Sequence, residues 1–158
     1  MRTLVTIFLT LAISGCGDVY SYLKSGEVGW ALNKELRDNT QVEIAKLTKF
    51  AWDEFFLFDP YLPKSEVCKR LMLSAAECKS MIKIESIGEG EMLMVFRLKG
   101  RLVHMELHRR YFGDFTPAPE KPFTPQTAVF LVSIEGKGAW GGDWLKLRPQ
   151  TQALGLGR

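Results

Sequence analysis

The sequence predicts an α+β domain, an antiparallel sheet of about five strands with short helices on one face. Three observations lead to this class. Two alternating apolar runs flank a two-residue turn at Lys99-Gly100, a dense aromatic run ends at Asp59-Pro60, and helix-capping residues lie between these features. Strands and helices that follow one another in separate blocks are typical of α+β folds. A parallel βαβ fold is therefore not expected.

The clearest local signal is a β-hairpin formed by residues 91–98 and 101–109. Gly100 in the turn supplies the positive φ that two-residue hairpin turns require. The register that this turn implies pairs apolar residues on one face: Phe96 with Val103, Met94 with Met105, and Met92 with Leu107. We assign this face to the core, because alternate residues of a strand share a face.

The remaining expected elements are short. Strands are expected at residues 52–58, 127–134 and 144–147, where β-branched and aromatic residues are dense, and Val42 and Ile44 alternate before the first of them. A helix is expected to begin with Ser65 as its cap, and a second one with the capping box Ser74-Ala75-Ala76-Glu77. Four prolines make the segment from Gly113 to Pro125 a loop.

The chain begins like an exported protein. Arg2 is followed by an uncharged, apolar stretch from Thr3 to Ile13, and the small residues Ser14 and Gly15 come next. This is the order of a signal peptide, and the stretch is too short to span roughly 30 Å of hydrocarbon as a stable helix. We therefore expect residues 1–15 to be removed, which leaves 143 of the 158 residues.

The end of this leader, Ile13-Ser14-Gly15-Cys16, resembles the lipobox of bacterial lipoproteins. The resemblance implies cleavage before Cys16 and acyl chains on that cysteine, which hold the protein on a membrane. Gly17 follows the cysteine, which in the sorting pattern of such lipoproteins favours the outer membrane, facing the periplasm. Residues 16–40 are then a lipidated tether, with a short helix indicated by the spacing of Val28, Ala31, Leu32 and Leu36. Residues 41–150 form one domain, and residues 151–158 are a loose tail.

The middle of the chain carries a weaker resemblance. Three short motifs, Phe50-Ala51-Trp52-Asp53, Phe58-Asp59-Pro60-Tyr61 and Gly113-Asp114-Phe115, are similar to those of small bacterial lipoproteins that have no settled activity. They cover about half of the chain. This resemblance implies a periplasmic type of domain and adds no chemistry.

Two cysteines remain in the domain. Cys68 and Cys78 suggest a disulfide, because an oxidising compartment favours one. One continuous helix would separate their α-carbons by about 15 Å, too far for a bridge. We therefore expect the chain to break between them and a new helix to begin at Ser74. A catalytic cysteine is the less favoured alternative.

One polar cluster lies on the second hairpin strand. His104, Glu106 and His108 alternate, so they share a face, and two imidazoles with a carboxylate can hold Zn²⁺ with one position open for water. The favoured interpretation is a solvated sheet face with ordinary cross-strand pairs. The metal site stays as the alternative.

Taken together, these features favour a non-enzymatic module that binds a protein, such as an inhibitor, an immunity protein or an assembly factor. No cofactor is expected. One basic residue, Arg2, belongs to the leader, so 20 basic side chains stand against 18 acidic ones, and no nucleic-acid partner is expected. The alternative function is a metal-assisted hydrolase that uses His104, Glu106 and His108.

Overall fold

The computed structural model describes residues 26–139 and 141–150. The leader at 1–15, Cys16 and the tail at 151–158 lie outside these residues. In chain order the elements are α1 (Glu27–Glu35), β1 (Gln41–Glu43), α2 (Ile44–Leu47), β2 (Glu54–Phe58), α3 (Lys64–Arg70), α4 (Ala75–Met81), β3 (Glu91–Leu98), β4 (Arg101–Arg109), the 3₁₀ turn η1 (Arg110–Phe112), β5 (Val129–Lys137) and β6 (Asp143–Pro149).

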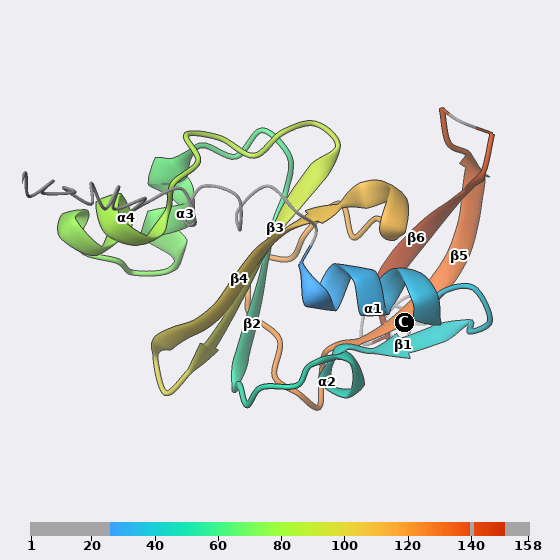
Figure 1. Cartoon of the computed structure of the whole chain (residues 1–158), viewed down its shortest axis with the longest axis horizontal. Coiled ribbons are helices and arrows are strands. Elements are labelled where there is room, and N and C mark those ends of the chain that lie inside the picture. The colour runs from blue at the N-terminus through green and yellow to red at the C-terminus, as the bar shows by residue number, and fades with distance from the viewer. Residues whose placement is uncertain (1–25, 140, 151–158) are drawn as a thin grey trace, which may run out of the picture.

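The described strands form two antiparallel sheets of three, in the orders β1-β5-β6 and β2-β3-β4 (Figure 1). The α+β class is thus confirmed, whereas the single sheet of about five strands is wrong. The difference arises after β4, where η1 and the proline-rich loop carry the chain away, so that β5 pairs with β1 rather than with the hairpin.

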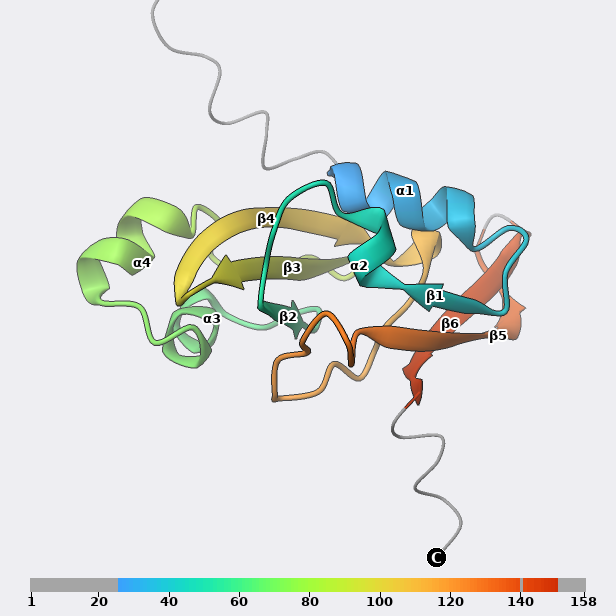
Figure 2. The same ribbon diagram turned by 90° about the horizontal axis from the view of Figure 1, so that it is seen from below.

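The sheet β2-β3-β4 lies between two hydrophobic cores. On one face, α3 and α4 cover Phe56, Phe58 and Leu93. On the other face, α1 and the second sheet cover Phe55 and Phe96. Figures 1 and 2 both show α3 and α4 at one end of the molecule and α1 beside β1 at the other. Helices therefore lie on both sides of this sheet, and expecting them on one face was wrong.

Coverage on both faces explains why β3 reads as a continuous apolar run and is buried from Met92 to Arg97. The hairpin has the expected bounds, but its register was predicted wrongly. Phe96 pairs with His104, while Arg97 pairs with Leu102, so Val103 is an extra residue in a bulge. Beyond the bulge every pairing shifts by one residue, which exchanges the two faces of β4.

The helices are confirmed in part. Val28 and Leu32 of α1, and Leu36 at its C-terminal cap, are buried in the core, so this section of the expected tether packs against the domain. In α4, Ser74 and Glu77 form the expected capping box. The expected cap at Ser65 is wrong, because α3 begins at Lys64 with Pro63 as its cap.

Cys68 on α3 and Cys78 on α4 form the expected disulfide, with their α-carbons 5.6 Å apart. The helices break at residues 71–74, and this break folds α4 back toward α3. The disulfide therefore fixes α3 and α4, the two helices that cover one face of the sheet β2-β3-β4.

Candidate functional site

His104, Glu106 and His108 do share a face of β4, but that face points into the protein. Glu106 is 3% exposed and His108 is fully buried, so the expectation of a solvated face was wrong. The cause is the bulge at Val103, which turns these three side chains toward α1 and the second sheet. Within residues 26–139 and 141–150, no three His, Cys, Asp or Glu side chains are grouped to hold a metal ion.

Glu106 binds the beginning of α1. Its carboxylate accepts hydrogen bonds from the backbone N–H groups of Gly29, at 2.7 Å, and Val28, at 3.2 Å. These N–H groups have no partner within a helix, and a negative charge at this end is also favoured by the helix dipole. Gly26 allows the approach, because a Cβ there would lie 2.1 Å from a carboxylate oxygen of Glu106. A residue 77 positions away in sequence thus caps α1.

The two histidines differ in their partners. The His104 ring donates from Nε2 to Glu106 at 2.7 Å and stacks on Phe50. The His108 ring donates from Nε2 to the Gly113 carbonyl at 2.7 Å, while its Nδ1 has no hydrogen-bond partner in the described chain. Burial lowers the pKa of His108, although the Gly113 carbonyl opposes this shift. His104 therefore holds the Glu106 carboxylate in position, and His108 holds the backbone at Gly113.

Asp114 is the centre of a second polar cluster, which links η1 to β6. The carboxylate accepts two hydrogen bonds from Arg110, one from Lys146 at 3.0 Å and one from the Trp144 ring nitrogen at 3.1 Å. The Thr116 backbone N–H adds another. Burial acts to raise the pKa of Asp114, but these donors outweigh it and hold the pKa below its usual value. Both oxygens of the Asp114 carboxylate therefore accept hydrogen bonds, and these bonds connect η1 to β6.

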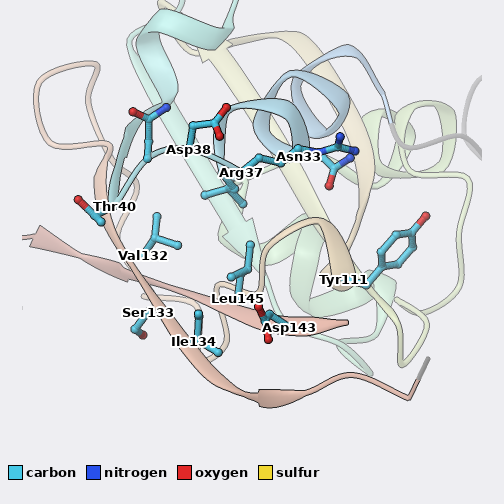
Figure 3. A pocket seen from close by; sticks show the side chains of 12 residues that line it. Asn33, Arg37, Asp38, Thr40, Tyr111, Val132, Ser133, Ile134, Asp143 and Leu145 are labelled. Carbon is cyan, nitrogen blue, oxygen red and sulfur yellow. The ribbon is translucent and has the colours of Figure 1, made fainter. Parts of the chain in front are cut away.

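A surface groove of about 710 Å³ lies between the end of α1 and the sheet β1-β5-β6 (Figure 3). Apolar side chains from these elements lie along it: Leu36, Val132, Ile134 and Leu145. Polar side chains surround them: Asn33, Arg37, Asp38, Asn39, Thr40, Ser133 and Asp143. Tyr111 of η1 also lines the groove (Figure 3).

Several groove side chains are available to a ligand. Ile134 is 64% exposed, although it stands on a strand next to the core. The charged groups of Arg37 and Asp38 are exposed and form no ion pair within the described part of the chain. The groove therefore combines open apolar surface with charges that are not already neutralised.

Sequence reasoning missed this groove, because its lining comes from four separated segments. The available signal was Asp38-Asn39-Thr40, a polar break that directly joins a helix to a strand, together with an isoleucine near the end of β5. Neither signal identifies a site without the pairing of β1 with β5, which brings the two segments together.

Comparison of the chain with known protein families, with curated protein sequences and with solved structures gives no match. Among the described helices, none has the length and apolar character needed to cross a membrane. The assignment of this protein therefore depends on the groove and on the leader sequence.

Proposed function

We propose that this protein is a lipid-anchored protein of the bacterial cell envelope whose domain binds a partner protein through the groove beside α1. The observation that carries this proposal is the composition of the groove, an apolar centre with Ile134 exposed and a polar rim. Specific protein interfaces have the same anatomy, a hydrophobic core surrounded by polar groups that remain accessible to water.

The residue types also support a protein partner. Tyrosine and arginine are enriched among the residues that dominate binding energy, and Tyr111 and Arg37 both line the groove. Tyr111 offers a large surface with few rotatable bonds, and Arg37 offers a planar donor set that forms no ion pair with the described residues. Asp38 beside Arg37 gives the rim both signs of charge, which favours a partner with complementary charges.

The anchor is supported by the lipobox and the apolar leader that precedes it. Two or three acyl chains bind a bilayer almost irreversibly, because each buried methylene contributes about 0.8 kcal/mol. The domain then meets its partner at the membrane, and the residue after Cys16 favours the periplasmic face of the outer membrane. In this proposal the protein acts as an inhibitor, an immunity protein or an assembly factor, without a cofactor.

The test is site-specific photo-crosslinking in cells. A photoreactive phenylalanine analogue replaces Tyr111 in the groove or, as a control, Met72, which is 78% exposed outside it. We expect a discrete crosslinked product from position 111 only. A second substitution, Ile134→Glu, should abolish that product, while Met72→Glu should leave it unchanged. Equal crosslinking from both positions, or a product that survives Ile134→Glu, would show that the groove is not the binding site.

A further inference from the structure

We propose that a second surface next to the groove seats the domain on anionic lipid headgroups. This surface, called the aromatic-basic surface below, consists of Trp30 and Lys34 of α1, Tyr111 of η1 and Arg109 of β4. The proposal rests on the lipid anchor proposed above. It adds an orientation, with one side of α1 and η1 facing the membrane.

The four side chains are connected through Phe112, through a hydrogen bond and along α1. The rings of Trp30 and Tyr111 both pack on Phe112, with centroid distances of 4.8 Å and 4.3 Å. Arg109 donates from Nη1 to the Tyr111 hydroxyl at 3.4 Å. Lys34 lies one helical turn after Trp30, so the two side chains share a face of α1.

Both aromatic rings are open to solvent, although the residue beneath them is buried. Trp30 is 58% exposed and Tyr111 is 55% exposed, whereas Phe112 is 4% exposed. Tryptophan and tyrosine prefer the interface between water and hydrocarbon, where the ring is partly desolvated and its polar group stays hydrated. Two such rings held on a rigid support fit this environment.

The charges around the rings are basic and available. Lys34 and Arg109 are exposed and form no ion pair within the described chain. Glu27, which lies three residues before Trp30 on the same side of α1, already pairs with Lys49. An anionic headgroup layer therefore meets two cations here that no ion pair within the described residues neutralises.

The position of the anchor selects lipid over protein for this surface. Only ten residue steps join Cys16 to Gly26, the residue that precedes α1, so at most about 35 Å of extended chain separates α1 from the acyl chains. Trp30 lies in the first turn of that helix. A short tether raises the effective concentration of the surface at the bilayer to the millimolar range, so that a weak headgroup contact is populated.

The experiment uses the lipidated full-length mature protein, reconstituted into vesicles of phosphatidylethanolamine with 30% phosphatidylglycerol. Brominated acyl chains in these vesicles quench tryptophans that reach the interface. We expect quenching in the native protein, loss of most of it in Trp30→Phe, and little change in Trp144→Phe. The charge variant Lys34→Glu should lower the ratio of docked to undocked protein at least fivefold, since each basic group near an anionic surface contributes about that factor. The exposed residue Lys79 on α4 provides the matched control Lys79→Glu.

Flotation of the vesicles separates the two proposals. Protein that fails to float with the vesicles overturns the anchor, and this inference with it. Protein that floats but is quenched equally in the native form and in Trp30→Phe keeps the anchor and overturns the seated orientation. Quenching that is equal in vesicles of neutral phosphatidylcholine would refute the role of the basic groups and overturn the proposed recognition of anionic headgroups.

Discussion

Replacing Asp114 by asparagine removes the charge that holds Arg110 and Lys146. The carboxylate accepts two hydrogen bonds from Arg110 and one each from Lys146, Thr116 N–H and Trp144. The asparagine amide retains one accepting oxygen, but its N–H₂ group faces other donors. The cations of Arg110 and Lys146 also lose their counter-charge in a largely buried cluster. Breaking a buried ion pair by removing one partner costs about 3 to 5 kcal/mol. This is a large part of the roughly 5 to 15 kcal/mol that stabilises a domain.

Urea denaturation at pH 7 measures this cost. Asp143→Asn is the matched control, because Asp143 is exposed on β6, the strand that carries Lys146, and its pair with Lys137 is open to water. We expect the control to lose no more than about 1 kcal/mol. The free energies of unfolding of Asp114→Asn and of the native protein should approach each other as the pH falls below about 4. The reason is that the pKa of Asp114 is lowered on folding, so the stability that its carboxylate contributes is lost in acid. A loss under 1 kcal/mol at pH 7 would refute the reasoning.

Four further predictions concern other parts of the chain. Glu106→Ala should lower the free energy of unfolding by about 2 kcal/mol or more, measured in urea, because buried N–H groups of α1 lose their acceptor. The free energy of unfolding should fall as the pH drops below about 6.5, since the pKa of His108 is lowered on folding and the unfolded chain takes up the proton first. The pH dependence of this free energy should be weaker in His108→Gln. Replacing Cys68 and Cys78 by alanine should lower the urea midpoint by the equivalent of about 2 to 3 kcal/mol, and an unchanged midpoint would contradict a stabilising bridge. Cys16→Ser should yield an uncleaved or membrane-free product, and mass spectrometry should find acyl chains on the native Cys16.

The features predicted correctly from the sequence are local ones. The hairpin turn at Lys99-Gly100 and the capping box at Ser74 depend on residues within one turn of each other. The disulfide was predicted because the helix break lies between its two cysteines and is itself a local signal. Short-range hydrogen bonds and φ preferences decide such features, so a single sequence contains enough information for them.

The features predicted wrongly depend on contacts between distant segments. The bulge at Val103 has no signal of its own, because a valine suits a regular strand as well as a bulge. The register between β3 and β4 is decided only by the packing of Met92, Met94 and Phe96 against the second sheet. The separation into two sheets depends in the same way on the pairing of β5 with β1, two segments more than 80 residues apart.

The misassigned face of β4 also explains how the groove is held in place. Glu106 appeared as a metal ligand because a carboxylate between two histidines fits that chemistry, yet here it fixes the first turn of α1. The other end of α1 is fixed by close packing, because Gly113 at φ 130° leaves no space for a side chain against Leu36 and Leu147. The helix between these two supports forms one wall of the groove. Because Glu106 holds the first turn of α1, and α1 contributes to both proposed surfaces, we expect its replacement to weaken groove binding and membrane seating together, whereas Ile134→Glu should affect the groove alone.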